Sequence, residues 1–397
     1  MNRKLWLILL IALLNAVGLT IVIPLFPFLI GQYVPAEKIA LYLGVLVSIY
    51  AVCKFFMAPI MGALSDYFGR IPILFFSLLA TAIGYFTLGI GGALWVLFLG
   101  RVIAGISAGD ISALYAYVAD STEGKERTKL YGYLGAANGI GYMIGPAIGG
   151  LLAIEYISLP FYIAGVISVI TALFMYFYLP ETLIEEKRKK EITVNAFNPF
   201  SHFKDIFNLK EARKIFILGS YFFIGLLFYQ SNISVYLKDI FAWGPAQIGV
   251  LFAFIGLSDI ASRAILLPRL LIFSERSVIS GGLFLMIIGF ACIVLSGILG
   301  VANLMYVSIV LITVGEGLFD PSYNNMLSQS VSDNKQGQLQ GVNQGLHSLY
   351  EIFAPLTAGV IYLYNPNAIY IIVALLMMTT LLCFYRVRRS MPAKIVQ

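Results

Sequence analysis

The chain is poor in the residues that build a water-exposed surface, a metal centre or a disulfide framework. Only 12% of its 397 residues are charged, whereas soluble domains carry about 25%, so a soluble globular domain is excluded. Its two histidines and three cysteines lack the spacing of a metal-ligand or disulfide motif. No nucleophile–base constellation, phosphate loop or haem-ligand pattern is present either. We therefore expect no enzyme activity, no cofactor and no metal site.

Apolar sequence fills the chain instead, with 60% hydrophobic residues. A helix of about 20 mostly apolar residues crosses the roughly 30 Å of hydrocarbon in a bilayer. The first run begins with Arg3 and Lys4, as a signal peptide does, but it is too long and has no clear cleavage site. We predict an all-α membrane protein with twelve transmembrane helices, at residues 5–30, 39–61, 71–91, 93–119, 129–153, 159–179, 213–237, 246–271, 277–298, 301–328, 338–362 and 367–386.

The basic residues are distributed unequally between the two sides of this predicted topology. Of 26 Lys and Arg, 21 lie in segments on one side, two (Lys38 and Lys238) on the other, and three within spans. Basic residues are enriched on the cytoplasmic side, so both termini are expected in the cytoplasm of a cell (inner) membrane protein. The net charge of +6 orients the chain in the lipid bilayer and predicts no nucleic-acid partner.

Six spans, a polar stretch and six more spans indicate an internal duplication. A shift of 209 residues places Gly132, Pro146 and Gly150 over Gly341, Pro355 and Gly359. We predict two pseudo-symmetric six-helix bundles, 1–180 and 213–397, and a cytoplasmic linker at 181–212, in a monomer. A site between two such halves, near the midplane, is typical of alternating-access transporters. The linker is read as solvated, or in part as an amphipathic surface helix.

A charged hairpin, Gly62-x-Leu64-x-Asp66-x-x-Gly69-Arg70, separates spans two and three. Gly69 permits the tight turn that two adjacent helices require. Asp66 can approach a helix N-terminus, and Arg70 can meet an acid on a neighbouring helix, for which Asp120 has the right depth. Such contacts could latch the two halves on the cytoplasmic side. The alternative is a helix cap with snorkelling basic residues.

Two glycine patterns follow this hairpin. Span four contains Leu97-x-x-x-Arg101-x-x-x-Gly105. Small residues at four-residue spacing let helices approach closely, and a proline bends its span. Span five contains the longer pattern, Gly141-x-x-x-Gly145-Pro146-x-x-Gly149-Gly150. Each pattern alone is typical of ordinary membrane packing.

Together, in this order and on these spans, the three motifs resemble those of the major facilitator superfamily. The span-five motif looks like the antiporter motif of its twelve-span drug:proton antiporters. The resemblance implies a role in gating for the hairpin, in proton coupling for Arg101, and in outward drug exchange for Gly145-Pro146. The residues to which it assigns gating are Asp66, Gly69, Arg70, Asp120, Gly141, Gly145, Pro146 and Gly149.

Two further stretches look like the tetracycline exporters of this superfamily. They are Asn15-Ala-Val-Gly18…Pro24-Leu-Phe-Pro27 in span one and Gln336-Gly-Gln-Leu-Gln-Gly341 before span eleven. Those exporters carry acids within spans one, three and nine, where this chain has Asn15, Gly84 and no acid. The scaffold is similar but the charges differ, which argues against tetracycline as the substrate. Asn15 is kept as a candidate cavity residue.

Ionisable residues within the spans are functional candidates, since a charge at the bilayer centre costs about 2.5–3.5 kcal/mol. Lys54 needs an acid or an aqueous cavity, and Asp110 lies at similar depth. Arg101 lies nine residues before Asp110 and so on the opposite face of a continuous helix; near the outer end, it could also snorkel. The full set is Lys54, Arg101, Asp110, Asp259, Arg263, Glu316, Asp320 and Glu351, with His347 as a titratable neighbour.

Three pairs in this set share a helix face at four-residue spacing. Asp259 can pair with Arg263, either as a structural ion pair or in substrate contact. Glu316 and Asp320 are both acidic, and their repulsion when ionised suits a proton carrier or a cation site. The third pair, a possible proton relay, is His347 with Glu351.

These observations favour a secondary transporter for a small molecule. The leading hypothesis is proton-coupled export of a small organic or amphiphilic solute by rocking of the two halves. The mixture of three basic and five acidic residues within the spans leaves open the proton-coupled uptake of a polar metabolite or chelate. A receptor or lipid translocator on the same scaffold is a third class, because fold does not fix function.

Overall fold

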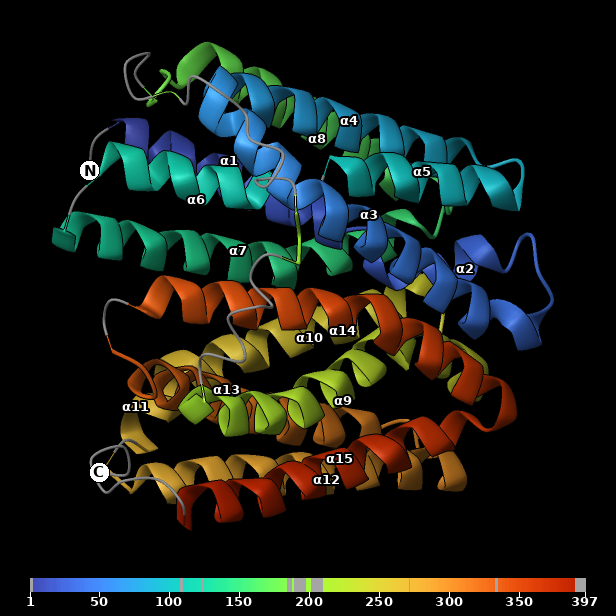
Figure 1. The fold of residues 1–397 in the computed structure, drawn as a ribbon. Helices are drawn as coiled ribbons and strands as arrows, with labels where there is room; N and C mark the ends of the chain where they lie inside the picture. The colour runs from blue at the N-terminus through green and yellow to red at the C-terminus, as the bar shows by residue number, and fades with distance from the viewer. Residues whose placement is uncertain are drawn as a thin grey trace. The chain divides into compact units, whose positions relative to one another are not determined.

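The computed structural model describes residues 3–107, 110–122, 124–183, 188, 198–200, 210–270, 272–332 and 335–389. These residues are helical almost throughout (Figure 1). Most of the linker predicted at 181–212 lies outside them. The first half of the chain contains α1 (Arg3–Thr20), η1 (Ile23–Leu25), α2 (Phe26–Ile30), η2 (Ala36–Lys38), α3 (Ile39–Phe68), α4 (Arg70–Ile90), α5 (Leu94–Ile106), α6 (Asp110–Ser121), α7 (Gly124–Leu152) and α8 (Leu159–Tyr178).

The second half repeats this succession of long helices. It contains α9 (Lys210–Phe241), α10 (Pro245–Ala261), η6 (Ser262–Leu266), α11 (Leu267–Leu270), α12 (Glu275–Leu299), α13 (Leu304–Gln329), α14 (Gln336–Tyr364) and α15 (Pro366–Arg389). Each of the twelve predicted spans therefore coincides with one helix or with a short series of helices. The predicted all-α architecture is confirmed.

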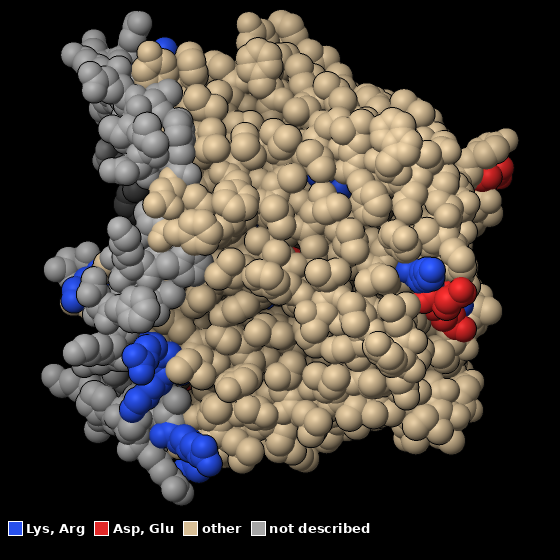
Figure 2. All heavy atoms as spheres, turned by 45° about the vertical axis from the view of Figure 1, so that its right-hand side comes forward, with Lys and Arg blue, Asp and Glu red and all other residues tan. Residues whose placement is uncertain are grey.

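Ten helices among the described residues are long and apolar enough to cross a membrane. Their most apolar windows are at most 56% buried, and large side chains such as Phe76, Trp95 and Phe177 are exposed. On the face drawn in Figure 2, the described charged side chains gather near the helix ends, with little charge between them. Apolar side chains on the outside of such helices suit contact with the hydrocarbon of a bilayer. Hydrocarbon, unlike water, forms no hydrogen bonds with polar groups.

Three predicted spans are interrupted rather than continuous. In span one, Pro24 and Pro27 lack the N–H that a regular helix needs, and the short 3₁₀ segment η1 separates α1 from α2. Span four is divided because α5 ends at Ile106, and α6 begins at Asp110. Span eight changes to a π-helix, η6, before α11. The predicted spans are present at these places, and each of the three comprises more than one helical segment.

The described contacts divide the chain into two compact units. The first unit comprises residues 1–36, 46–199 and 244–253, and the second comprises 37–45, 200–243 and 254–397. The first unit thus includes the beginning of α10 (residues 244–253), and the second includes the beginning of α3 (residues 37–45). The predicted division at 1–180, 181–212 and 213–397 stays a prediction.

Within the first unit, α1 packs on α7 and α8, and α4 packs on α5 and α8. One buried apolar cluster joins α1, α4, α6, α7 and α8, with Leu74, Val118 and Leu134 among its most buried members. Close packing of this kind leaves these helices little room to shift relative to one another. It therefore places the hairpin between α3 and α4 near the end of α6.

Within the second unit, α12 packs on α13 and α15, and α9 packs on α14, α15 and α13. A Cβ on Gly282 would lie 2.8 Å from the Gly315 carbonyl oxygen, so α12 and α13 approach closely where both lack side chains. The rings of Phe222 and Phe319 stack 4.0 Å apart between α9 and α13. These contacts bring the acidic face of α13 toward α9.

Candidate functional site

Arg263 is the centre of a cluster with three carboxylates in the second unit. Its Nε lies 2.7 Å from Asp259 Oδ1, and its Nη1 lies 3.0 Å from Asp320 Oδ2. Its Nη2 lies 3.9 Å from Glu316 Oε1. The four side chains are between 21% and 37% exposed. With all groups ionised, one guanidinium faces three carboxylates, and the cluster carries an excess of negative charge.

Local helix geometry positions the arginine. Arg263 lies in η6, a π-helical segment, and such segments occur often at functional sites. Ser262 of the same segment donates its hydroxyl to the Val314 carbonyl at 3.3 Å, and Gly317 leaves room for that hydroxyl. The π-helical segment therefore lies directly against the part of α13 that carries the two acids.

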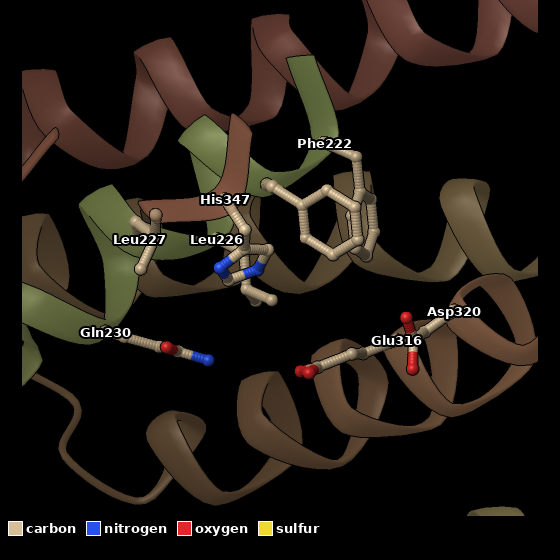
Figure 3. Close-up of a pocket in the computed structure, with 8 residues that line it drawn as sticks. Phe222, Leu226, Leu227, Gln230, Glu316, Asp320 and His347 are labelled. Carbon is tan, nitrogen blue, oxygen red and sulfur yellow. The ribbon is translucent and has the colours of Figure 1, made fainter. Parts of the chain in front are cut away.

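A cavity of about 260 Å³ adjoins this cluster. In Figure 3, Glu316 and Asp320 project from α13, His347 from α14, and the remaining side chains from α9, with Gln230 and Glu316 extending toward the same open space. The cavity combines an aromatic and aliphatic wall with a small number of polar groups, which is typical of small-molecule sites. Its lining residues are Phe222, Phe223, Leu226, Leu227, Gln230, Glu316, Asp320 and His347.

His347 lines the cavity and also lies close to an acid on its own helix, Glu351. Its Nδ1 lies 3.8 Å from Glu351 Oε1, and its ring packs against Phe223 with centroids 4.8 Å apart. The predicted neighbours at four-residue spacing are thus close together. Their role as a proton relay stays a prediction.

The cluster was predicted only in part. The ion pair between Asp259 and Arg263 is present as expected, and Glu316 shares a helix face with Asp320. The sequence did not reveal that Arg263 joins both pairs, because that depends on which helices pack together. Gln230 was missed as well, although an amide within a predicted span was a signal that could have found it.

Arg101 lies against aromatic rings in the first unit. Its guanidinium carbon is 4.3 Å from the ring centroid of Tyr50 and 5.0 Å from that of Phe26. Its Nε is 3.4 Å from the carbonyl oxygen of Leu46. Planar guanidinium groups stack well on aromatic faces, so these contacts hold the arginine on α5 toward α2 and α3. Its role in proton coupling stays a prediction.

Other predicted residues lie on helices of the first unit. Asn15 on α1 and Lys54 on α3 are half-buried. Asp110 begins α6, but its side chain lies outside the described residues, so the pairing of Lys54 with Asp110 is untested. The expectation that Arg101 and Asp110 face opposite ways assumed one continuous helix; since α5 ends at Ile106 and α6 begins at Asp110, it stays a prediction.

The hairpin forms a compact charged group at one end of the first unit. Arg70 donates from Nη1 to Asp66 at 2.7 Å and from Nε to Asp120 at 2.8 Å. The expected contact of Arg70 with Asp120 is therefore present. Gly69 adopts φ = +108°, a conformation that favours glycine, as the tight turn requires.

Glu181, which follows α8, was missed as a partner of this hairpin. Its carboxylate accepts hydrogen bonds from the backbone N–H groups of Arg70 and Ile71, both at 3.0 Å. An acid at a helix N-terminus satisfies otherwise free N–H groups and the helix dipole. These partners all belong to the first unit, and a latch between the two halves stays a prediction.

The span-five glycines form the packing surface between α7 and α1. Thr20 donates its hydroxyl to the Gly141 carbonyl at 3.0 Å. A Cβ on Gly145 or Gly149 would collide with Thr20 or Ile21. The helix also continues through Pro146. The predicted close approach of the small residues is confirmed, whereas their part in drug exchange is untested.

Comparison with known proteins agrees with the fold. The chain matches the family model of the Major Facilitator Superfamily over residues 8–349 and 270–396. The tetracycline resistance protein, class C, of Escherichia coli is 33% identical over 368 residues, covering 91% of this chain and 90% of that protein. Multidrug resistance protein 2 of Bacillus subtilis (strain 168) is 28% identical over 362 residues, covering 87% and 85%.

A solved structure shares the architecture at lower identity. A crystal structure of the nucleoside transporter NupG superimposes with a TM-score of 0.78 and 16% identity, covering 97% of this chain and 100% of that chain. At this identity the likeness concerns the fold alone. The family model, the tetracycline and multidrug resistance relatives and the helical architecture agree: the chain is a multi-pass membrane protein and belongs to the major facilitator superfamily.

Proposed function

We propose that the protein exports an amphiphilic organic cation in exchange for protons, by alternating access of the halves 1–180 and 213–397. The solute would contact the cavity between α9, α13 and α14. Glu316 and Asp320 would exchange protons, with Glu351 and His347 beside them. Both termini would be cytoplasmic, and the working form would be a monomer.

The observation that carries this proposal is the excess of carboxylates around Arg263. Three acids share one guanidinium at distances of 2.7, 3.0 and 3.9 Å, at the depth of membrane-spanning helices. An unbalanced charge in a poorly hydrated place is costly. Either a proton or a cationic solute removes the imbalance, so the two compete for the same carboxylates. Competition of this kind couples the two movements in opposite directions.

Two features support the outward direction. The span-five motif resembles that of drug:proton antiporters, and its glycines lie against α1. Two of the relatives described above are named for resistance to tetracycline and to several drugs. The differing membrane charges at Asn15 and Gly84 favour a solute other than tetracycline.

The gating groups are assigned to the hairpin and its partners. Arg70 would alternate between its present acids, Asp66 and Asp120, and new partners when the cytoplasmic side opens. Gly69 would keep the turn tight, and the α1–α7 contact would transmit movement as a rigid pair.

The test uses the full-length chain in proteoliposomes with ethidium or tetracycline as the probe. With a pH gradient imposed, we expect ethidium transport coupled to proton movement, measured by ethidium fluorescence and a trapped pH dye. Glu316→Gln should abolish the coupling, whereas Arg276→Gln, at an exposed arginine on α12, should retain it. If a pH gradient drives neither probe, nor any other solute of an extended drug panel, proton antiport is wrong. Uptake of a polar metabolite would be supported instead by growth defects of a deletion strain on single nutrients without altered drug sensitivity.

A further inference from the structure

The α9 wall of the cavity in the second unit carries a single polar residue. The residues of α9 that line the cavity are three or four positions apart and so share one face of the helix. Four are aromatic or aliphatic and the last is an amide: Phe222, Phe223, Leu226, Leu227 and Gln230. Gln230 lies eleven residues before the end of α9 at Phe241, or about 16 Å along the helix. The amide is therefore well inside a membrane-spanning helix, where an unsatisfied polar group is costly.

The side chains of Gln230 and Glu316 face each other without being bonded. Figure 3 shows the Gln230 amide and the Glu316 carboxylate projecting from α9 and α13 into the same open space. Among the residues that the structure describes, neither side chain has a hydrogen-bond partner. The contact of Glu316 with Arg263 is 3.9 Å, longer than a hydrogen bond. Two unsatisfied polar groups from different helices thus converge on one cavity.

Glu316 differs in this respect from the other two acids of the Arg263 cluster. Asp320 accepts hydrogen bonds on both carboxylate oxygens, from Arg263 at 3.0 Å and from Asn324 at 3.1 Å. Asp259 accepts one from the Arg263 Nε at 2.7 Å. Donors of the protein therefore hold these two acids. The Glu316 carboxylate is free to accept from a group that enters the cavity.

The aromatic part of the α9 wall is fixed by its neighbours. The ring of Phe222 stacks on that of Phe319 at 4.0 Å. The ring of Phe223 lies edge-on to His347 at 4.8 Å and to Tyr323 at 5.4 Å. A preorganised surface loses little freedom on binding, and aromatic rings favour stacked or edge-to-face neighbours. This wall suits the aromatic ring of a solute.

The opposite groups select the polar part of the solute. An ionised carboxylate only accepts hydrogen bonds, and an amide has an accepting oxygen beside its NH₂ group. A positively charged nitrogen with two or more N–H groups satisfies both acceptors, donating one N–H to Glu316 and another to Gln230. A quaternary ammonium has the same charge but no N–H, so it satisfies neither. The number of N–H groups then decides how tightly a cation binds.

We infer that Gln230 is a specificity-determining residue, and that the cavity binds an arylalkyl ammonium ion with at least two N–H groups between Gln230 and Glu316. The aryl ring lies against the apolar wall of α9, and the ammonium donates to Gln230 Oε1 and to the Glu316 carboxylate. The cavity volume of about 260 Å³ equals that of about nine liquid waters at about 30 Å³ each, which suits one ring with a short amine chain. The inference rests on the proposed function, because it names the solute class of the same cavity.

The experiment measures the binding of four phenethylamine derivatives to the purified full-length protein in detergent at neutral pH, by isothermal titration calorimetry. The amine carries no, one, two or three N-methyl groups, so the charge and the ring are kept while the N–H groups fall from three to none. In the wild type we expect two steps in affinity. Loss of the bond to Gln230 should weaken the dimethyl amine about threefold to tenfold relative to the monomethyl amine. Loss of the charged bond to Glu316 should weaken the trimethyl analogue about tenfold or more beyond that.

The variants assign each step to one residue. Gln230→Met keeps the length of the side chain and removes the amide, so it should abolish the first step and keep the second. Glu316→Gln should weaken all four amines and shrink the second step. Gln329→Met is the matched control, because Gln329 is exposed thirteen residues after Glu316 on α13 and bonds to Asn325 at 3.2 Å; both steps should remain. The Tm of each variant verifies folding, and Gln230→Leu repeats the test if Gln230→Met does not fold.

The outcomes separate this inference from the proposed function. Equal affinities of the wild type for all four amines, or a first step that persists without the Gln230 amide, would overturn the inference and leave proton-driven ethidium transport standing. Failure of every amine to bind a wild type that transports ethidium would overturn the solute class. The expected two steps in a protein whose transport no pH gradient drives would support the binding site and overturn the proposed antiport.

Discussion

Arg263 and Asp320 lie 57 residues apart in the sequence and are joined by a hydrogen-bonded ion pair of 3.0 Å. The same guanidinium also holds Asp259 of its own helix at 2.7 Å. A single cation thus organises acids from two helices. Its removal and the neutralisation of each acid are expected to have distinct consequences.

Replacement of Arg263 by methionine should destabilise the protein, because three neighbouring carboxylates lose their shared cation. We expect a loss of about 1–3 kcal/mol in the free energy of unfolding, measured by thermal or denaturant unfolding in detergent. The loss should be larger at pH 8 than at pH 5, since ionised carboxylates repel one another. Arg276→Met, at an exposed position over Tyr385, should stay within about 0.5 kcal/mol. Equal losses for the two variants would contradict the central role of Arg263.

Neutralising Asp320 should cost more stability than neutralising Glu316. Asp320 accepts short hydrogen bonds from Arg263 at 3.0 Å and from Asn324 at 3.1 Å, whereas Glu316 is 3.9 Å from Arg263. Hydrogen bonds to charged groups contribute about 1.5–3 kcal/mol, so Asp320→Asn should lower Tm clearly. Glu316→Gln should keep a near-wild-type Tm and lose gradient-driven transport. A reversed order of the two Tm values would refute this division of roles.

Gly69→Ala should destabilise the turn between α3 and α4. The residue has φ = +108°, and a Cβ would lie 2.5 Å from Glu181 Oε2. With ψ = +163°, this backbone conformation is essentially confined to glycine and costs another residue about 1–3 kcal/mol, and displacing Glu181 would also uncap α4. Gly62→Ala on α3, where a Cβ would meet no atom within 4 Å, should be neutral or stabilising by up to about 1 kcal/mol. Unfolding in detergent measures both, and a harmless Gly69→Ala would refute the assigned turn geometry.

Gly145→Ala should weaken the contact between α7 and α1. A Cβ there would meet the Thr20 side chain and lie 3.1 Å from the Ile21 backbone nitrogen. Overpacking of this kind costs about 1–3 kcal/mol, which should appear as a lower Tm. Gly139→Ala on the same helix, where a Cβ would have open space, provides the control and should not lower Tm. Indistinguishable Tm values would mean that the helices are less closely packed than described.

The comparison of sequence and structure shows which features depend on one helix alone. The pairs of Asp259 with Arg263 and of His347 with Glu351 follow from helix geometry, so they were predictable. The contact of Arg263 with Asp320 depends on how η6 packs against α13, and a single sequence carries no such information. Glu181 was missed because it follows α8 in a segment interpreted as the start of a solvated linker.

The hydrophobic periodicity of the sequence also did not reveal where the spans are interrupted. Apolar content continues through Pro24 and through 262–266, so hydropathy detects the span and not the change of helix type.

The glycine-lined contacts have a mechanical consequence. Where α7 meets α1 through Gly141 and Gly145, backbone rests nearly on backbone, and there is no compressible layer of side chains to deform. Regular hydrogen bonding in the first span is interrupted at η1, so we expect bending of that span to occur there and not at the glycine contact. In the second unit η6 carries Arg263, so we expect bending at that segment to move the cation relative to Glu316 and Asp320 on α13 and to change the local balance of charge.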